Sequence, residues 1–268
     1  MKNKKLSHNG LQGSVTSVMA ALLCILIGLA VGFLVLLAIN PAHAWADGFV
    51  RILKGGFHDA PYGVGKELAN AAPLIMTGLS VGFAFKTGLF NIGAAGQYTL
   101  GAYGALYCAI MLKLPWFVCL LAAAILGGLW GAIPGFFKAY FNINEVITSI
   151  MFNWIGLYLV NELVYQNGTG PMYDVRNTRT LNLGKNADLA QSVIPDFGLN
   201  KLFQTNSTTI AIFLAAVVAI LIWVVLNKTT FGYELKAVGL NKSAARYAGI
   251  NEKKNIILSM AIAGALAG

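Results

Sequence analysis

Residues 15–39 read VTSVMAALLCILIGLAVGFLVLLAI, a run of 25 residues without a charged side chain. A helix needs about 20 apolar residues to cross the roughly 30 Å of hydrocarbon in a bilayer. A secretory signal is the alternative, because lysines precede the run and Ala42-His43-Ala44 resembles a cleavage site. The apolar part of a signal has only about 7–15 residues. The length of the run therefore favours an uncleaved first membrane span.

Six further apolar runs follow this one along the chain. They cover residues 68–85, 90–112, 115–137, 146–160, 207–226 and 255–268. The last run has 14 residues and no signal that would stop a helix, so we expect a truncated span there. The pattern predicts an all-α fold: a polytopic transmembrane helical bundle with about six complete spans and a truncated seventh. We expect residues 1–268 to form a single transmembrane domain that is incomplete at its C-terminus.

The composition excludes other classes of protein. Hydrophobic residues make up 57% of the chain and charged residues 11%, whereas a soluble domain has about 25% charged residues. So few charges cannot cover a surface that faces water, and a disordered chain could not leave so much apolar area exposed. A net charge of +9 would fit nucleic-acid binding in a soluble protein. Here most of the excess lies between apolar runs, so we expect membrane lipid, and no nucleic acid, as a partner.

The basic residues also orient the chain. With the N-terminus inside, the cytoplasmic segments hold eleven of the 19 Lys and Arg residues but only three of the ten Asp and Glu residues. An excess of Lys and Arg is typical of cytoplasmic loops. The sequence thus predicts a multi-pass protein of the cytoplasmic (plasma or inner) membrane. It also predicts an extracytoplasmic loop at 164–206 and a cytoplasmic loop at 228–254.

The third run contains an amide among small residues. Gly93, Gln97 and Gly101 recur at four-residue spacing and share one face of a helix, and Asn91 precedes them. Glycines at this spacing let helices approach closely, so helix packing is one interpretation. A buried amide costs free energy unless it finds partners, however, and such groups often border a polar path. Both interpretations remain open for this stretch.

The fifth run carries a similar polar stripe. Glu145, Ser149 and Asn153 follow one another at four-residue spacing, with Trp154 next to the last of them. Hydroxyl groups in membrane helices often bond only to their own backbone. If the stripe faces the bundle, it lines a route for a solute. The candidate residues of the substrate pathway are Asn91, Gln97, Ser149, Asn153 and Trp154.

Several kinds of chemistry have no residues to support them. No Asp, Glu, Lys, Arg or His lies at the middle of an apolar run, where a proton-coupled pump would normally need one. The patterns GxxxxGK[ST], GxSxG and HExxH are absent from the sequence. We therefore expect no catalytic residues, no metal site and no cofactor of its own. Energy for any driven transport would come from another chain.

The predicted cytoplasmic loop contains a short helix with signals at both ends. Asn241 suits an N-cap and Gly249 suits the position just after a helix. Two helical turns are too short to be stable alone in water, so we expect them to dock on a cytoplasmic partner. An interfacial helix lying on lipid headgroups is the alternative. The candidate coupling residues are Gly239, Asn241, Ala244, Ala245, Arg246 and Gly249.

Three segments together resemble a known family. They read GLFNIGAAGQ at 88–97, WGAIPG at 130–135 with Lys138 and NEVIT at 144–148, and GYELKAVG at 232–239 with AARYAGI at 244–250. They resemble the membrane permease subunits of ABC importers of the branched-chain amino acid, ribose and nucleoside type, and are closest to the simple sugar and nucleoside branch. That branch usually has an acidic residue where Ala95 stands, so no role of that carboxylate carries over.

The resemblance implies partners and a mechanism. Residues 232–250 would be the coupling segment that fits a cleft in a cytoplasmic ATPase subunit, which would bind the ATP. A second permease subunit would complete the pore, and an extracytoplasmic solute-binding protein would deliver the substrate. Members of the family have more spans after the coupling segment than this chain contains.

These points lead to one functional hypothesis and two rivals. The resemblance implies that the chain moves a nucleoside or a simple sugar by alternating access, and amides without fixed charges suit such a neutral polar solute. An ion-gradient-driven transporter or channel would need ionisable groups or unwound helices near the middle of the membrane. A membrane enzyme acting on lipid would need a catalytic constellation.

Overall fold

The computed structural model describes residues 2–268, and the side chains of all of these except residues 2–15, 167 and 185. Most of the chain is helical, in agreement with the predicted fold class. The chain divides into two compact units, Met1–Val64 and Gly65–Gly268.

The first unit is built on α1 (Lys2–Ile39), whose apolar stretch Thr16–Ile39 is long enough to cross a membrane. The chain then turns through a π-helical segment, η1 (Ala44–Phe49), into α2 (Val50–Lys54) and the 3-10 turn η2 (Gly55–Phe57). The rings of Trp45 and Phe49 stack with centroids 5.7 Å apart, and both contact Phe33 of α1. Aromatic packing therefore holds this turn against the end of the helix.

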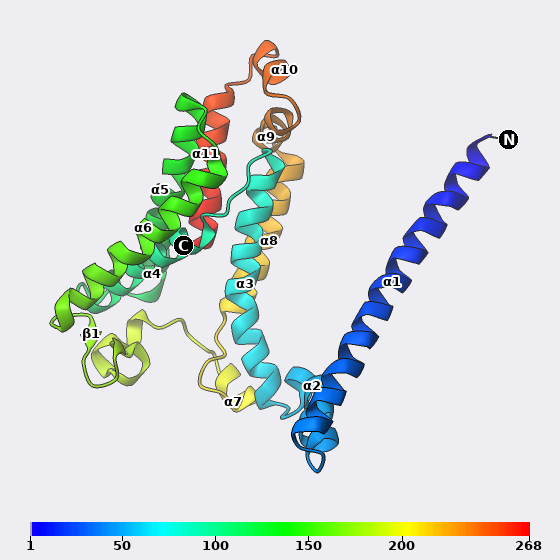
Figure 1. The fold of residues 1–268 in the computed structure, drawn as a ribbon. Coiled ribbons are helices and arrows are strands. Elements are labelled where there is room, and N and C mark those ends of the chain that lie inside the picture. The colour runs from blue at the N-terminus through cyan, green and yellow to red at the C-terminus, as the bar shows by residue number, and fades with distance from the viewer. Residues whose placement is uncertain (1) are drawn as a thin grey trace. The chain divides into compact units, whose positions relative to one another are not determined.

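The second unit is a helical bundle (Figure 1). Its six longest helices are α3 (Tyr62–Lys86), α4 (Ala94–Ile110), α5 (Trp116–Phe141), α6 (Glu145–Tyr165), α8 (Ala211–Lys228) and α11 (Glu252–Ala267). The short helices α9 (Thr230–Leu240) and α10 (Lys242–Tyr247) connect α8 to α11.

Five of the described helices are long and apolar enough to span a membrane: α1, α3, α5, α6 and α8. The run at 90–112 forms a shorter helix than the sequence indicates, because α4 has 17 residues and a length of about 25 Å. Residues 87–93 before it are not helical, and Gly88 has a φ of +68°. Hydropathy alone could not reveal this turn, because Leu89, Phe90 and Ile92 in it are as apolar as the residues of a membrane span. The helix α5 continues through Pro134 to Phe141, so that proline does not end it.

Glycines form the contact between α5 and α11, the most extensive contact in the bundle. A Cβ atom built on Gly127 would lie 2.5 Å from the carbonyl oxygen of Gly264, and one built on Gly131 would lie 2.5 Å from that of Met260. Real side chains do not fit at these distances. The small residues therefore let the two backbones touch, which is the packing mode of membrane helices that small residues allow.

The loop at 164–206 holds the only described strands, β1 (Tyr173–Asp174) and β2 (Arg179–Thr180), which pair antiparallel. The 3-10 turns η3 (Gln166–Gly168), η4 (Leu183–Lys185) and η5 (Ala187–Ser192) and the helix α7 (Leu199–Phe203) complete it. The loop is attached to the turn between α4 and α5, because Ser192 Oγ donates to the Leu114 carbonyl oxygen over 2.6 Å. Side chains that bond to exposed carbonyls in this way fix an otherwise irregular segment.

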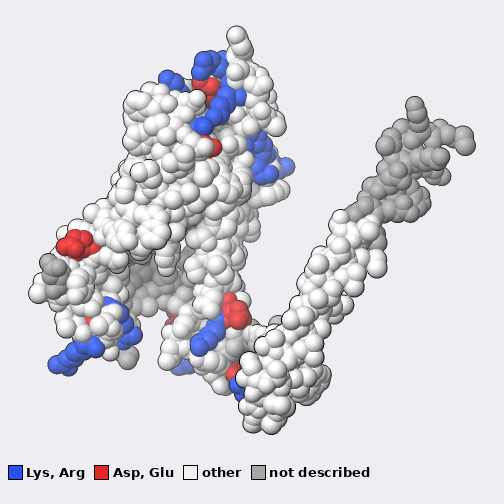
Figure 2. Space-filling model, in the orientation of Figure 1, with Lys and Arg blue, Asp and Glu red and all other residues white. Residues whose placement is uncertain are grey.

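Charge is distributed unevenly over the second unit. On the face that Figure 2 shows, its Lys and Arg side chains gather at the α9–α10 end and around the loop at the opposite end, with an uncharged surface between them. The helices that cross this surface are the candidate spans α3, α5, α6 and α8. An uncharged band between two charged ends is the surface that a bilayer requires, and the chain is a multi-pass membrane protein.

Candidate functional site

Asn91 and Gln97 form a reciprocal pair of amides in the middle of the second unit. Asn91 Nδ2 donates to Gln97 Oε1 over 2.8 Å, and Gln97 Nε2 donates to Asn91 Oδ1 over 3.0 Å. Asn91 Nδ2 also donates to Ser80 Oγ of α3 over 3.2 Å. Both amide side chains are 1% exposed. This amide pair is thus fully desolvated, and each amide satisfies the other, as buried polar groups must.

The turn between α3 and α4 brings the two amides together. We call residues 87–93 the Gly88 turn. Gln97 lies six positions after Asn91, a spacing that would put them on different faces of one continuous helix. Because α4 begins only at Ala94, Asn91 folds back onto the first turns of α4. The turn is itself held by Thr87 Oγ1, which hydrogen-bonds Ser259 Oγ of α11.

Small residues of the Gly88 turn, α5 and α6 enclose the amide pair. A Cβ built on Gly93 would lie 3.1 Å from Gln97 Nε2 and 3.4 Å from Ser149 Cβ, and one built on Gly131 of α5 would lie 3.2 Å from the same Nε2. Ser149 is fully buried, and in the described part of the chain its Oγ has no hydrogen-bond partner. The amide pair is therefore packed on all of these sides, in a closed arrangement.

Asn153 joins α6 to the start of α4. Its Oδ1 accepts a hydrogen bond from the backbone N–H of Gly96 over 2.7 Å, and its Nδ2 donates to the Ile92 carbonyl oxygen over 2.8 Å. The first N–H groups of a helix have no partner within the helix, so Asn153 caps α4 from a neighbouring helix. Trp154 lies apart from this cluster: its side chain is 57% exposed and its ring stacks on Tyr158.

Of the five pathway candidates, the structure thus brings four together, Asn91, Gln97, Ser149 and Asn153. A role in contacting a solute stays a prediction for all five. Sequence reasoning missed Ser80 and Ser259, which hold Asn91 and the Gly88 turn. The signal available for them was weak, because single serines in apolar helices commonly bond to their own backbone.

The short helix α10 has the ends that the sequence predicts. Asn241 Oδ1 accepts from the backbone N–H of Ala244 over 3.0 Å, and Gly249 has a φ of +81°. The N–H of Gly249 bonds to the Arg246 carbonyl and that of Ile250 to the Ala245 carbonyl, each over 3.0 Å. These two bonds make a Schellman motif. Local capping therefore defines both ends of α10.

Loss of the N-cap should loosen α10 alone. In Asn241→Ala the N–H of Ala244 loses its acceptor, and the expected cost is about 1 kcal/mol. Hydrogen exchange should show faster exchange at residues 244–248, while exchange in α5 stays unchanged. Asn241→Ser, which keeps an acceptor, is the matched control. Equal protection of residues 244–248 in both variants would contradict the importance of the cap.

The coupling candidates lie on two different faces. Ala245 is 3% exposed and packs in a cluster with Val238 and Ile256. Ala244 and Arg246 face outward, and Arg246 forms an ion pair with Glu252 at the start of α11. The flanking side chains Leu240 and Tyr247 are 89% and 94% exposed. The outer face of α10 is therefore free to contact another molecule, while Ala245 anchors the helix to the bundle.

A groove of about 620 Å³ lies between α9 and α10. Tyr233, Ala237 and Leu240 of α9 line it, as do Asn241, Ala244 and Ala248 in and beside α10. Glu234 on its wall accepts a hydrogen bond from Asn255 Nδ2 over 3.0 Å. The groove is thus largely apolar, and the hydrogen bond from Asn255 fixes its α9 wall to α11.

Gly239 connects the α9–α10 segment to the Gly88 turn. A Cβ built on Gly239 would lie 2.5 Å from the carbonyl oxygen of Lys86 and 3.0 Å from the nitrogen of Gly88. A Cβ built on Gly88 would in turn lie 2.9 Å from the Gly239 oxygen. Two backbones therefore touch at these glycines. Sequence reasoning assigned Gly239 to the partner-binding surface, and the structure places it against the molecule's own turn.

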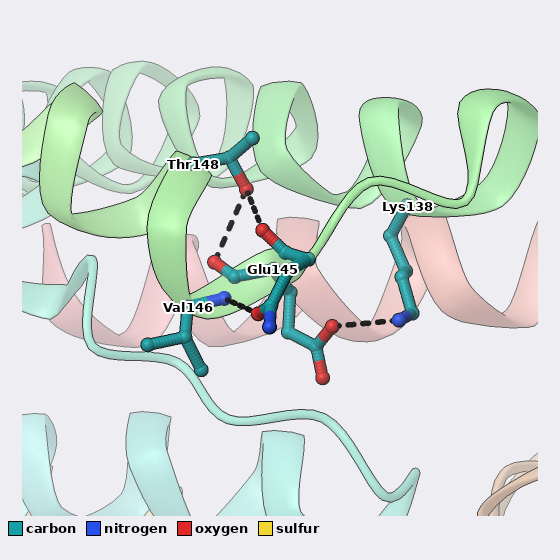
Figure 3. Close-up of polar contacts among 5 residues, drawn as sticks. Lys138, Glu145, Val146 and Thr148 are labelled. Atoms are coloured by element: carbon teal, nitrogen blue, oxygen red, sulfur yellow. Dashed lines mark hydrogen bonds and ion pairs between the residues drawn. The ribbon is translucent and has the colours of Figure 1, made fainter.

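A mostly buried ion pair lies near the start of α10. Lys138 Nζ of α5 is 2.8 Å from Glu145 Oε2 of α6, with side chains that are 16% and 14% exposed, and Figure 3 shows the two reaching across the turn between these helices. Asn144 caps α6 by accepting from the Val146 N–H over 2.9 Å. Burial lowers the pKa of Lys242, and the positive charge of Lys138 lowers it further, while Glu145 opposes both effects. The charges of this ion pair therefore act on Lys242, the first residue of α10.

Known proteins resemble this chain in sequence over most of its length. Residues 65–268 match the family described as "Branched-chain amino acid transport system / permease component". The guanosine ABC transporter permease protein NupP of Bacillus subtilis is 35% identical, over 99% of this chain and 71% of that protein. The nucleoside ABC transporter permease protein NupB of Lactococcus lactis is 32% identical, over 94% and 68%. The glucose ABC transporter permease protein TsgB13 of Haloferax volcanii is 35% identical, over 91% and 64%.

No solved structure matches this chain. The family match covers the whole second unit, including the amide pair, the Gly88 turn and the α9–α10 segment. The similar proteins are transport permeases, and their lengths exceed that of this chain. The chain belongs to the family of permease components of the branched-chain amino acid transport system type.

Proposed function

We propose that this permease carries nucleosides across the cytoplasmic membrane, as the membrane-spanning subunit of an ATP-binding cassette importer that works by alternating access. Two of the similar permeases are named for guanosine and nucleoside transport. The third is named for glucose transport, which makes simple sugars the second substrate class. A neutral polar solute agrees with four path candidates that carry amides or a hydroxyl and no charge.

The observation that carries the proposal is a continuous chain of contacts from α10 to the amide pair. The outer face of α10 is exposed, and Ala245 on its inner face packs beside Val238 of α9. Gly239, the next residue of α9, touches Gly88. The Gly88 turn ends in Asn91 and Gly93, which contact Gln97 and Ser149. A displacement of α10 therefore has a short, well-packed route to the pathway candidates.

Transport requires this route to have two arrangements. A partner that binds α10 equally well in both would shift nothing, because a ligand moves an equilibrium only by its differential affinity for the two states. In the arrangement seen, the amides bond to each other. In the second arrangement, separation of the Gly88 turn from α4 would free the amide groups of Asn91 and Gln97 for a solute.

The proposed partners follow from the same surfaces. A cytoplasmic ATPase subunit would receive α10 and the α9–α10 groove, a second permease subunit would complete the path, and an extracytoplasmic binding protein would dock on the loop at 164–206. This arrangement places the N-terminus and residues 228–254 in the cytoplasm. Of the described loops, the one with α9 and α10 is the richer in Lys and Arg, as cytoplasmic loops are.

Thiol labelling tests this orientation. In Ser243→Cys, the new thiol lies on the exposed part of α10. An impermeant thiol reagent should leave it unlabelled in intact cells and label it once the membrane is opened. The thiol of Gln191→Cys, in the loop at 164–206, should already be labelled in intact cells. Labelling of residue 243 in intact cells would overturn the orientation and the proposed ATPase contact together.

Uptake measurements test the substrate class and the energy source. Cells that carry the complete transporter should accumulate radiolabelled guanosine, and an excess of unlabelled nucleoside should compete while glucose does not. An ATPase subunit that binds but cannot hydrolyse ATP should abolish uptake. Competition by glucose alone would assign the sugar class instead. Uptake that survives loss of ATP hydrolysis but stops when the ion gradient is dissipated would favour the ion-gradient alternative.

A further inference from the structure

A second groove lies between α3 and α8, and it shares no lining residue with the groove of α9 and α10. Its volume is about 550 Å³. Gly78 and Gly82 of α3 line it, and a Cβ atom built on either would meet nothing within 4 Å. Ile222 and Leu226 of α8 line it as well. Most of the groove is therefore an apolar channel between two candidate membrane spans.

Only one end of this groove is polar. Lys86, the last residue of α3, and Asn227, the last but one of α8, both line it, as does Trp223. Lys228 Nζ lies 5.8 Å from the centroid of the Trp223 ring, and Lys236 Nζ donates to Asn227 Oδ1 over 2.9 Å. Figure 2 shows basic side chains beside the α8–α9 end of the unit.

These ammonium groups form no ion pair with any described residue. Across the part of the chain that the structure describes, the ion pairs involve neither Lys86 nor Lys228 nor Lys236. The groove lining likewise contains no Asp or Glu. The polar end therefore holds excess positive charge, next to an apolar channel that faces the membrane.

From this geometry we propose that the groove binds an anionic phospholipid. One acyl chain would lie along Gly78 and Gly82, where the missing side chains leave room, and the phosphate would sit between Lys86 and the lysines of the α8–α9 end. Basic pockets between membrane helices are suited to anionic headgroups. Tryptophan is also common at the depth of the headgroups, which agrees with Trp223 at the polar end.

Charge favours a lipid over a helix of a second copy. Glycines four residues apart, such as Gly78 and Gly82, can also accept a neighbouring membrane helix. A helix in the same orientation would bring its own basic residues to the same side of the membrane, however. It would add positive charge where three lysines already lie. A phospholipid instead supplies the negative charge that this end lacks.

Quenching of Trp223 fluorescence by brominated lipids tests the proposal. The full-length protein is reconstituted in phosphatidylcholine that contains the same fraction of either brominated phosphatidylglycerol or brominated phosphatidylcholine. The signal of Trp223 is the difference between this protein and Trp223→Phe. Quenching by the brominated phosphatidylglycerol should be several-fold stronger. Lys86→Gln should reduce it to the phosphatidylcholine level, whereas Lys86→Arg should preserve it.

A steric variant and two competitors complete the test. Gly82→Leu fills the groove and should lower the quenching by phosphatidylglycerol, while Gly28→Leu, at an equally open position in α1, should not. Equal quenching of the Trp223 signal by the two lipids, in the protein with its groove unaltered, would overturn the proposal. Disulfide formation between Gly82→Cys copies would assign the groove to a second copy. Displacement by inorganic phosphate would reduce it to a site for free phosphate.

Discussion

Replacing Gly239 by valine is expected to lower uptake at least tenfold while the assembled transporter continues to hydrolyse ATP. The Cβ of residue 239 would lie 2.5 Å from the Lys86 oxygen and 2.9 Å from the carbonyl carbon of Thr87. Both are backbone atoms, so no side-chain rotation can relieve the contact. The α9–α10 segment and the Gly88 turn must move apart. Displacement of α10 would then no longer be transmitted to Asn91.

The expected magnitudes separate loss of transmission from loss of folding. Overpacking of a well-packed site costs about 1–3 kcal/mol, which leaves most membrane bundles assembled. Uptake should fall at least tenfold, whereas co-purification of the ATPase subunit should stay near the level of the unmodified protein. Uptake by Gly239→Ala should lie between that of Gly239→Val and that of the unmodified protein, because alanine adds the Cβ without the valine methyl groups.

The control is Gly32→Val, because a Cβ at Gly32 of α1 meets nothing within 4 Å. It adds the same side chain to another apolar helix and should leave uptake unchanged. Full uptake by Gly239→Val would show that the contact with Gly88 transmits nothing. Loss of the ATPase subunit from Gly239→Val would instead assign the residue to the docking surface, as the sequence alone suggested.

The role of Gly239 illustrates what could be predicted from the sequence and what could not. The helix α10 was predictable at both ends because its signals are local: Asn241 caps its own helix and Gly249 adopts its own positive φ. The neighbour of Gly239 is the Gly88 turn, more than 140 residues away in the chain. A glycine is equally compatible with exposure and with a backbone contact, so composition and spacing gave no means to choose.

The spans show the same division. Long apolar runs predict helices of sufficient length, and five of the described helices have it. The late start of α4 was not predictable, because Phe90 and Ile92 in the Gly88 turn are as apolar as residues within a span. A glycine in an apolar run is compatible with a kink, a helix end or close packing, and the glycines of α5 contact α11. Hydropathy measures the preference for lipid, and it does not specify which helix supplies the neighbouring surface.

Polar residues of the site were predictable as a group but not as partners. An amide in an apolar run must find hydrogen bonds, so Asn91, Gln97 and Asn153 stood out at once. Which groups they bond was not accessible, since Asn153 bonds to backbone atoms of α4 and Asn91 reaches Ser80. Ser149 differs from these amides: it lies in the same cluster, but its Oγ has no hydrogen-bond partner among the described residues.

The mutual bonding of the amide pair leads to the second large effect, which is expected to be non-additive. In Asn91→Leu, Gln97 loses a donor and an acceptor, and in Gln97→Leu the same happens to Asn91. A buried polar group left without partners costs about 1–3 kcal/mol, whereas replacing both partners by apolar groups can be nearly neutral. Each single variant should therefore be less stable than the double variant Asn91→Leu with Gln97→Leu.

Thermal unfolding of the detergent-solubilised protein measures this difference. For a chain of this size, about 1 kcal/mol corresponds to roughly 2–4 °C in Tm, so each single variant should unfold several degrees early and the double variant should regain much of the loss. Contacting residues commonly show interaction energies of about 0.5–3 kcal/mol in such cycles. Strictly additive losses would mean that the two amides act separately.

Uptake by the same three variants distinguishes a structural pair from a pair that binds the solute. If the amides only hold the Gly88 turn to α4, the double variant should recover uptake along with stability. If they also exchange their mutual bonds for bonds to a nucleoside, the double variant should be stable and yet inactive, because leucine offers no donor or acceptor. We expect the second result, since the route from α10 ends at these two side chains. Recovery of uptake in the double variant would move the solute path away from Asn91 and Gln97.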